Sequence, residues 1–442
     1  MFQHRQASFM FAFVIALLSA FQVAAQNERA LTIERIMSAP FPHELSAAPS
    51  NNRVAWVHSA QGVRNIWTAS APDYRGRQLT NYTKEDGQEI AGLVWTPDAA
   101  TILFVRGGGA NRQGDNPNPA NDPAGAEQSV WRISVSGGEP VRVGAGNDPI
   151  VSPRGNLVVF TQRGQVFSAP LDGKSEPAPL FRVRGGATSL RFSPDSSKIA
   201  FVSDRGDHSF VGVYDINEKS LRYIDPGVDS DSEPAWSPDG TQLAFLRVPA
   251  SSQLNIFRAV RSARPWSIQV ANLATNESRT VWRAKEGRGS AFWPVNAEKQ
   301  VLWAADDRII FPYEGDGWLH LYSVPARGGS AMLLTPGEFE VEYVSLSPDR
   351  RQIIFNSNQG DIDRRHLWRV GVAENRPVAI TRGEGIEWSP AMMSDGRTLV
   401  YLRSGARRPA QAVIQIESNE ARELAPGTVP ADYPERALIE PQ

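Results

Sequence analysis

Short runs of β-branched and aromatic residues recur along the chain, and each follows a polar turn. The clearest runs are Ile199–Val202, Leu243–Leu246, Ile353–Phe355 and Leu399–Leu402. Runs of this length, bounded by Gly, Pro, Asp and Ser, predict buried β-strands rather than helices. Beyond Ala25, no long stretch holds a convincing helical apolar period. We therefore expect an all-β protein.

The turn and its strand form a repeating unit, in which an aromatic residue follows the turn proline by seven positions. The regular copies are Pro97 to Phe104, Pro153 to Phe160, Pro194 to Phe201, Pro238 to Phe245 and Pro348 to Phe355. The variants are Pro49 to Trp56, Pro294 to Trp303 with two extra residues, and Ser394 to Tyr401 without the proline. Proline presets φ at the first central position of such a turn, and Asp and Gly suit the positions that follow.

The spacing of successive units, as from Pro153 to Pro194 and from Pro194 to Pro238, is typical of four-stranded propeller blades. The repeat therefore predicts an eight-bladed β-propeller of four-stranded antiparallel blades over residues 26–424. The expected blades are at about 42–80, 85–145, 146–181, 182–225, 228–282, 283–335, 336–381 and 382–424. A linker or tail at 425–442 would follow the last blade.

The N-terminal segment, positions 1–25, has the features of a cleaved signal peptide. His4 and Arg5 precede an apolar run from Phe9 to Phe21, and small residues at Val23–Ala25 suit cleavage before Gln26. The alternative is a membrane anchor, for which the apolar run is short. We expect a periplasmic or secreted protein that does not contact the membrane after cleavage.

Composition narrows the chemistry further. Hydrophobic residues make up 41% of the chain, enough for a sizeable core, and the formal net charge of −2 offers no attraction for nucleic acid. The chain has no cysteine, which excludes disulfides and a thiol nucleophile. The six histidines show no metal-ligand spacing. We expect no metal and no cofactor.

Two segments interrupt the repeat. Residues 107–127 are rich in Gly, Asn, Pro and Asp, and we expect them to form a mobile surface loop. Residues 247–265 mix apolar and basic side chains. They could form an ordered excursion that contacts a partner, or an elaborated connection between strands.

Three longer motifs lie between residues 264 and 390: Arg264–Ile268, Phe311–Tyr322 and Ser357–Trp368. They resemble the N-terminal propeller of the prolyl oligopeptidase (S9) family of serine peptidases, especially its dipeptidyl-peptidase-IV-like and acylaminoacyl-peptidase-like members. Pro430–Pro434 is similar to the link into the hydrolase domain of those enzymes. The turn unit itself is shared with TolB-like (PD40) propellers.

The resemblance implies an α/β-hydrolase domain that carries a serine in a Gly-x-Ser-x-Gly elbow. The sequence contains no such elbow, since Gly328–Met332 lacks the second glycine, and the last histidine, His366, lies within a repeat. We expect no catalytic residue and no peptidase activity from this chain alone. The hydrolase domain would be supplied by another chain or belong to a lost C-terminal part.

Two clusters are candidates for binding a peptide substrate or docking the hydrolase domain. The first comprises Glu314, Asp316, Trp318 and His320 around a Gly-rich turn, where a carboxylate could bind the ammonium group of a peptide. The second comprises Asp361, Asp363, Arg364 and Arg365. The alternatives are a blade turn for the first cluster and an inter-blade salt-bridge cluster for the second. The adjacent glutamates typical of dipeptidyl peptidases have no counterpart, because Val341 separates Glu340 and Glu342.

A further acidic group comprises Asp225, Asp229, Asp231 and Glu233. Calcium could use such oxygens, but their spacing is not that of an EF-hand loop, and a solvated turn is favoured.

Three functions fit these observations. The chain could be the non-catalytic propeller of an S9-type peptidase, acting as substrate gate and docking domain. It could instead be a stand-alone, TolB-like periplasmic propeller that binds a protein or peptide. An independent propeller enzyme with carboxylates in the funnel, such as a glycosidase, is the third alternative.

Overall fold

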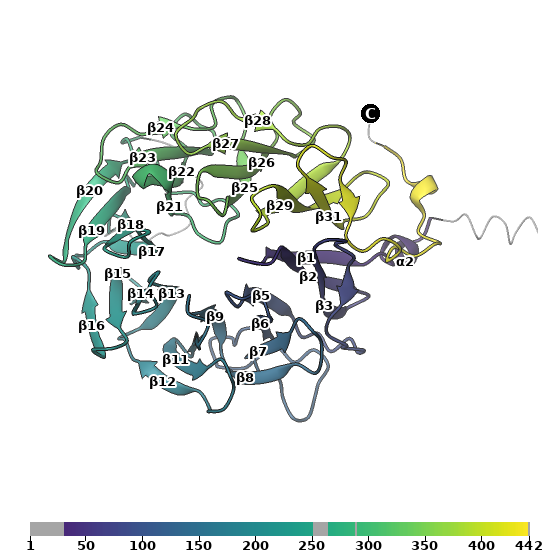
Figure 1. Ribbon diagram of the computed structural model, residues 1–442, viewed down its shortest axis with the longest axis horizontal. Helices are drawn as coiled ribbons and strands as arrows, with labels where there is room; N and C mark the ends of the chain where they lie inside the picture. Colours follow the sequence, from purple (N-terminus) through teal and green to yellow (C-terminus); the bar gives the residue numbers. More distant parts are fainter. Residues whose placement is uncertain (1–30, 251–263, 288–289, 441–442) are drawn as a thin grey trace, which may run out of the picture.

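The computed structural model describes residues 31–250, 264–287 and 290–440, and its strands form sheets arranged in a ring (Figure 1). Within these residues the only helical segments are α2 (Ile33–Ile36) and two 3₁₀ turns, Ala305–Asp307 and Glu435–Ala437. No helix in the described parts has the length and apolar content needed to cross a membrane. The prediction of an all-β fold is confirmed.

Consecutive strands fall into groups of four. Groups 1 to 4 are β1 (Phe41–Ala47), β2 (Arg53–Ala60), β3 (Val63–Ser70), β4 (Arg77–Gln78); β5 (Ile90–Trp95), β6 (Thr101–Arg106), β7 (Ser129–Ser134), β8 (Val141–Ala145); β9 (Asn147–Val151), β10 (Leu157–Gln162), β11 (Gln165–Pro170), β12 (Ala178–Phe181); and β13 (Gly186–Phe192), β14 (Lys198–Asp204), β15 (Ser209–Asp215), β16 (Ser220–Tyr223).

Groups 5 to 8 continue in the same order. They are β17 (Ser230–Trp236), β18 (Gln242–Val248), β19 (Ser267–Asn272), β20 (Glu277–Arg283); β21 (Leu302–Ala304), β22 (Arg308–Tyr313), β23 (His320–Pro325), β24 (Met332–Leu333); β25 (Val341–Leu346), β26 (Gln352–Ser357), β27 (His366–Gly371), β28 (Val378–Ala379); and β29 (Ile386–Met392), β30 (Thr398–Ser404), β31 (Gln411–Ile416), β32 (Arg422–Glu423).

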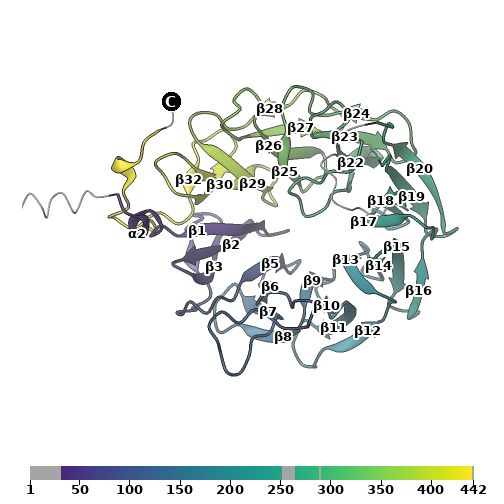
Figure 2. The ribbon, with the colours of Figure 1, turned by 180° about the vertical axis from the view of Figure 1, so that it is seen from behind.

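Within each group, neighbouring strands pair antiparallel. In the described residues these groups make seven sheets, because groups 4 and 5 share one sheet of eight strands. A single parallel pair, Ser209 with Ser230, joins the two halves of that sheet. The first strand of each group lies toward the centre of the ring and the fourth lies at its rim, as Figure 2 also shows from behind.

The second strand of each group carries a fully buried aromatic residue. These residues are Trp56, Phe104, Phe160, Phe201, Phe245, Phe311, Phe355 and Tyr401, all at most 1% exposed. Seven lie where the repeat predicts them. The sixth prediction is wrong, because Phe311 and not Trp303 occupies this position: Phe311 of β22 faces Tyr322 of β23, and the preceding turn is the proline-free Ala305–Asp307.

The turn between the first and second strands is held by its own side chains. In group 4 the Ser193 hydroxyl donates to Asp195 at 2.6 Å, and the Lys198 N–H donates to the Ser193 hydroxyl at 2.9 Å. The same bonds recur between Ser237 and Asp239 and between Ser347 and Asp349. The bond from Ser193 is the largest of the contacts that lower the pKa of Asp195 to about 2. These aspartates serve the turn and are not functional candidates.

Groups 1 and 8 close the ring by side-chain packing and a few hydrogen bonds rather than by a shared sheet. No strand pairing between them is present in the described residues, and Val54 and Trp56 of β2 pack in one cluster with Val400 and Leu402 of β30. The Asn52 side chain accepts from the Ser394 hydroxyl at 2.7 Å. The Gly76 N–H donates to the Leu424 carbonyl at 2.6 Å, and a Cβ at Gly76 would lie only 2.5 Å from that oxygen.

The two ends of the described chain also meet. The side chain of Arg35, in α2, donates to the Asp432 carbonyl at 2.6 Å. Residues near both termini therefore lie beside the contact between groups 1 and 8.

Replacing a repeat aromatic tests how strongly the sheets depend on it. Phe355→Ala removes a fully buried ring, and we expect the free energy of unfolding to fall by about 3–5 kcal/mol. Ile362→Ala is the control, because Ile362 is 77% exposed. This substitution should lower the free energy of unfolding by less than about 0.5 kcal/mol. Urea unfolding followed by tryptophan fluorescence measures both. Equal losses would contradict the assigned role of Phe355.

Candidate functional site in the central cavity

A cavity of about 1240 Å³ lies among the first strands of the groups. Its wall comes mainly from β1, β5, β9 and β13, with Tyr343 of β25 and Trp388 and Ser389 of β29. The wall contains both apolar and charged side chains. The charged ones are Glu44, Asp148, Arg191, Glu298 and Lys299.

A β-bulge recurs in these first strands, five residues before the turn position of the repeat. The bulged residue has a positive φ in six groups: Glu44, Gly92, Asp148, Ser189, Glu233 and Ser389, with φ between 50° and 62°. Each lies where the ladder to the second strand shifts register. A bulge re-aims a side chain out of the ladder, and all of these residues except Glu233 line the cavity.

The three bulge carboxylates have different surroundings. Glu44 accepts from the Gly92 N–H at 2.7 Å, and Glu233 accepts from the Gln300 N–H at 3.0 Å. Asp148 forms no ion pair with any described residue. Enclosure by protein raises the pKa of Asp148, against the opposing effects of Arg191 and Thr161.

Residues 294–301, which we call the inner arm, precede β21 and extend toward the centre of the ring (Figure 1). Asn296 of the arm pairs with Tyr343 of β25: its N–H donates to the Glu342 carbonyl at 2.7 Å, and its carbonyl accepts from Val344 at 3.0 Å. On the other side, Arg191 of β13 donates to the Glu298 carbonyl at 3.3 Å. The arm therefore joins groups 4 and 7 and places Glu298 and Lys299 in the cavity wall.

The side chain of Glu298 is 82% exposed and lies 3.4 Å from the Lys299 ammonium. Lys299 lowers the pKa of the Glu298 carboxyl against the opposing effect of the surrounding protein, and Arg191 adds to the lowering. Burial lowers the pKa of His43, which also lines the cavity. With His43 neutral, three carboxylates face two cationic side chains, and the wall carries a formal excess of one negative charge.

The predicted cluster Glu314, Asp316, Trp318 and His320 lies in the β22–β23 loop and at the start of β23, and none of the four lines the cavity. His320 is fully buried: its Nε2–H donates to the Gly337 carbonyl at 3.0 Å, and its Nδ1 lies 3.2 Å from the Thr335 hydroxyl. Burial lowers the pKa of His320, so its ring is neutral. Asp316 lies 3.6 Å from the His320 ring, and its carboxylate also accepts from the Trp318 N–H.

His320 belongs to a polar contact that recurs between third and fourth strands. In group 6 the Leu321 N–H donates to the Thr335 hydroxyl at 3.0 Å. The corresponding bonds run from Ile66 to Thr80 and from Leu367 to Thr381. His320 directly precedes the residue whose N–H donates to the threonine. The residues at the same place are Asn65 in group 1 and His366 in group 7.

The second predicted cluster, Asp361, Asp363, Arg364 and Arg365, lies in the β26–β27 loop, also outside the cavity wall. Arg364 pairs with Asp361 at 2.9 Å and with Glu384 of the connection to group 8. Arg365 pairs with Glu342 of β25 at 2.6 Å. The Asp363 N–H donates to the Asp361 carboxylate at 3.0 Å. These contacts tie the loop to its own sheet and to the next connection.

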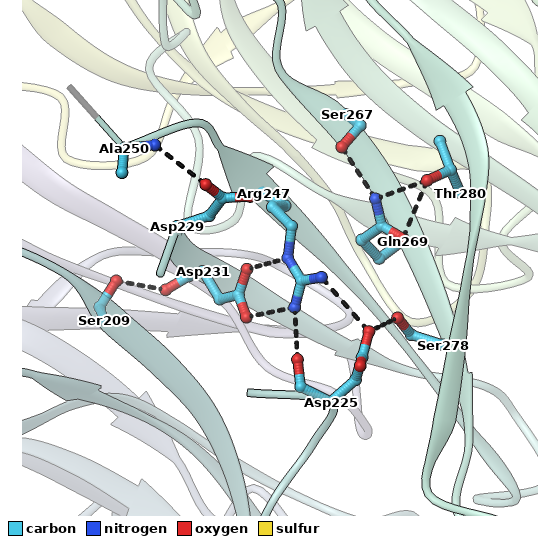
Figure 3. A network of polar contacts seen from close by, with 10 residues as sticks. All are labelled: Ser209, Asp225, Asp229, Asp231, Arg247, Ala250, Ser267, Gln269, Ser278 and Thr280. Carbon is cyan, nitrogen blue, oxygen red and sulfur yellow. Dashed lines mark hydrogen bonds and ion pairs between the residues drawn. The ribbon is translucent and has the colours of Figure 1, made fainter. Parts of the chain in front are cut away.

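Two members of the acidic group, Asp225 and Asp231, contact Arg247 (Figure 3). Arg247 donates to both oxygens of Asp231, at 2.7 and 2.8 Å, and to the Asp225 carbonyl at 2.7 Å. Asp231 is 1% exposed, so the prediction of a solvated turn is wrong for this residue. Burial raises the pKa of Asp231 against the opposing effect of Arg247. The Ala250 N–H donates to Asp229, and residues 251–263 of the predicted excursion lie outside the described residues.

A smaller cavity of about 230 Å³ lies under the 107–128 loop of group 2. Its acidic residues are largely paired, Asp86 with Arg106 and Glu127 with Arg142. The central cavity is therefore the stronger candidate for binding, because it is larger and its wall has more charged groups without an ion pair among the described residues.

Sequence reasoning missed the whole set of cavity residues, including Asp148 and Arg191. A signal was present, because the bulge position lies at a fixed distance from each turn. What the linear pattern did not reveal is that this position faces the centre of the ring.

Comparison with known proteins gives one matching family. Residues 248–409 match the model of the dipeptidyl peptidase IV (DPP IV) N-terminal region. The chain is similar to a probable dipeptidyl-peptidase 5 of Emericella nidulans, with 21% identity over 69% of this chain and 49% of that protein. It therefore spans about half the length of this curated relative.

Two solved structures share the fold. Dipeptidyl peptidase 4 of Porphyromonas gingivalis has a TM-score of 0.61 and 12% identity, over 87% of this chain and 60% of that one. A puromycin-hydrolyzing peptidase of Mycobacterium tuberculosis has a TM-score of 0.52 and 14% identity, over 89% of this chain and 54% of that one.

The network of Figure 3 yields a stability prediction. Arg247→Ala leaves Asp231 buried without its partner, and we expect the free energy of unfolding to fall by about 3–5 kcal/mol. Arg351→Ala is the control, because its pair with Asp306 is 3.6 Å long and well exposed and contributes less than about 1 kcal/mol. Chemical denaturation of both variants measures the difference. A loss as small for Arg247→Ala as for the control would contradict the assigned role of the network.

His58 yields a prediction for acid. The side chain is 5% exposed and packs edge-on against Trp67, and burial, followed by His43, lowers the pKa of His58 from 6.5 to about 4. Between these values the unfolded chain binds a proton that the folded chain excludes, so stability falls as pH falls.

Between neutral pH and pH 4, we expect His58 to reduce the free energy of unfolding of the wild-type protein by on the order of 3 kcal/mol. The variant His58→Phe should lack this part of the reduction. Urea midpoints at pH 7, 5 and 4 measure it. The same pH dependence in both proteins would show that His58 is not responsible.

Proposed function

We propose that this chain, which matches the dipeptidyl peptidase IV N-terminal region, acts as the substrate gate and docking domain of an S9-type peptidase. The resemblance found in the sequence is confirmed by the family match over residues 248–409. The proposed role in proteolysis is that of the non-catalytic partner. An α/β-hydrolase domain supplied elsewhere performs the hydrolysis.

We also propose that the ring has eight blades, one for each group of strands. Groups 4 and 5 share a sheet only through the pair Ser209–Ser230. Each nevertheless has its own turn and its own buried aromatic residue, Phe201 in group 4 and Phe245 in group 5. This count agrees with the periodicity of the sequence.

The central cavity is the observation that supports the gate most strongly. Its volume of about 1240 Å³ exceeds the range of ordinary small-molecule pockets, roughly 300–1,000 Å³. The wall combines aromatic side chains with charged groups of both signs. A peptide matches such a wall, because it offers apolar side chains, backbone polar groups and charges together.

The assignment of hydrolysis to another domain rests on the sequence. It contains no Gly-x-Ser-x-Gly elbow, which positions the serine of an α/β-hydrolase. Export to the periplasm or the medium is part of the proposal, since the segment from Met1 to Ala25 has the pattern of a signal peptide.

The second candidate function is a stand-alone, TolB-like periplasmic propeller that binds a peptide or protein. The Ser-Pro-Asp-Gly repeat that TolB-like propellers share supports it. The two candidates share the cavity and differ in whether a hydrolase domain docks on the ring.

Peptide binding to the purified chain tests both the gate and the place of the site. The fluorescence anisotropy of a fluorescein-labelled hexapeptide should rise when the peptide binds to the chain. Thr188→Trp fills part of the cavity, which Thr188 lines, and should weaken binding at least about tenfold, equivalent to 1.4 kcal/mol. Thr275→Trp makes the same change in the exposed β19–β20 turn and should leave binding unchanged.

Absence of binding by wild type, or equal binding by Thr188→Trp, would contradict the proposed gate.

A fluorophosphonate probe, which reacts with active-site serines, tests whether this chain is non-catalytic. The chain alone should remain unlabelled, and labelling of a serine would refute its non-catalytic role.

A further inference from the structure

We propose that Asp148 is a subsite of the central cavity for a positively charged group carried by a peptide, an ammonium or a guanidinium. The inference rests on the proposed peptide-binding role of the cavity and adds the residue and the chemical class it selects.

The other charged groups of the wall already have partners. The Glu44 carboxylate accepts from the Gly92 N–H, and Glu298 pairs with Lys299 at 3.4 Å. Arg191 donates to two carbonyls, Leu190 at 2.9 Å and Glu298 at 3.3 Å. Arg191 therefore remains near Asp148 without forming an ion pair with it. Glu44 and Asp148 are thus the two wall carboxylates without an ion pair among the described residues, and of these only Glu44 accepts the Gly92 N–H.

The backbone holds Asp148 in place. Its φ of 51° lies in the left-handed region, which Asp and Asn tolerate better than most residues. The preceding Asn147 accepts from the Thr161 hydroxyl at 2.6 Å, and the following Pro149 is buried. The backbone that carries the Asp148 side chain therefore needs little reorganisation when a cation binds, which favours affinity.

The rest of the wall suits the stem of a cationic side chain. Lysine and arginine carry their charge on a chain of methylene groups that packs on apolar surface. The same cavity provides such surface through Phe41, Trp95, Ile150, Phe192 and Trp388.

A single introduced thiol can report the charge at this place. The chain has no cysteine, so Ser189→Cys, in the same wall, creates a unique reactive group. The thiol is modified in turn with a cationic reagent, trimethylammonioethyl methanethiosulfonate, and an anionic reagent, sulfonatoethyl methanethiosulfonate. The selectivity ratio is the rate of modification by the cationic reagent divided by the rate with the anionic one. Ser70→Cys, on an exposed residue outside the cavity, provides the reference ratio.

We expect the ratio at Ser189→Cys to favour the cation by at least about tenfold over the reference, because a carboxylate in a concave wall raises the local concentration of cations. Asp148→Asn should remove most of this preference, while Asp363→Asn, the same change on the β26–β27 loop, should leave it intact. A ratio equal to the reference, or one that Asp148→Asn does not change, would overturn the proposal.

Peptides then identify the source of the charge. Acetyl-Ala-Ala-Lys-Ala-Ala-amide should bind about tenfold more tightly than its norleucine analogue, and Asp148→Asn should abolish that difference without weakening the analogue. Penta-alanine amide with a free amino end tests the terminal ammonium in the same way. If no peptide binds while the thiol ratio behaves as expected, the peptide-binding function fails and the cation preference of Asp148 stands. Equal binding of charged and uncharged peptides would overturn the subsite.

Discussion

Each group of four strands has two faces to cover, and it can cover them only against its neighbours. This constraint explains the ring, because a row of such sheets that did not close would leave two apolar faces in water. The critical contact is the one between groups 1 and 8, which no shared strand reinforces in the described part of the chain. Trp56, Val400 and Leu402 pack there, and Asn52 and Gly76 add hydrogen bonds to the loops of group 8.

Closure of the ring also creates the cavity. Once the sheets are arranged around an axis, their first strands face one another, and a bulge in six of these strands turns one residue out of the ladder. The chemistry of the cavity is then set by a few such positions, among them Glu44, Asp148 and Ser189. The inner arm adds Glu298 and Lys299 from outside the repeat. The scaffold is thus separable from the residues that determine what it binds.

The turn unit and its aromatic residue could be predicted from sequence because both are local. Seven buried aromatics, such as Phe201 and Phe355, lie where the seven-residue spacing predicts them. Phe311 was missed because its turn lacks proline. The site was not predictable in this way. His320 was chosen for its chemistry but is buried within its own sheet, whereas Asp148 faces the cavity only because distant strands surround one axis.

The central claim is that the binding site is the cavity inside the ring and not the outer loops. The most direct test is a crystal structure of the chain with the blocked lysine peptide bound. The account predicts peptide density between β1, β9 and β13, with the lysine ammonium within hydrogen-bond distance of Asp148. Density on the β22–β23 or β26–β27 loop, with the cavity occupied only by water, would contradict it.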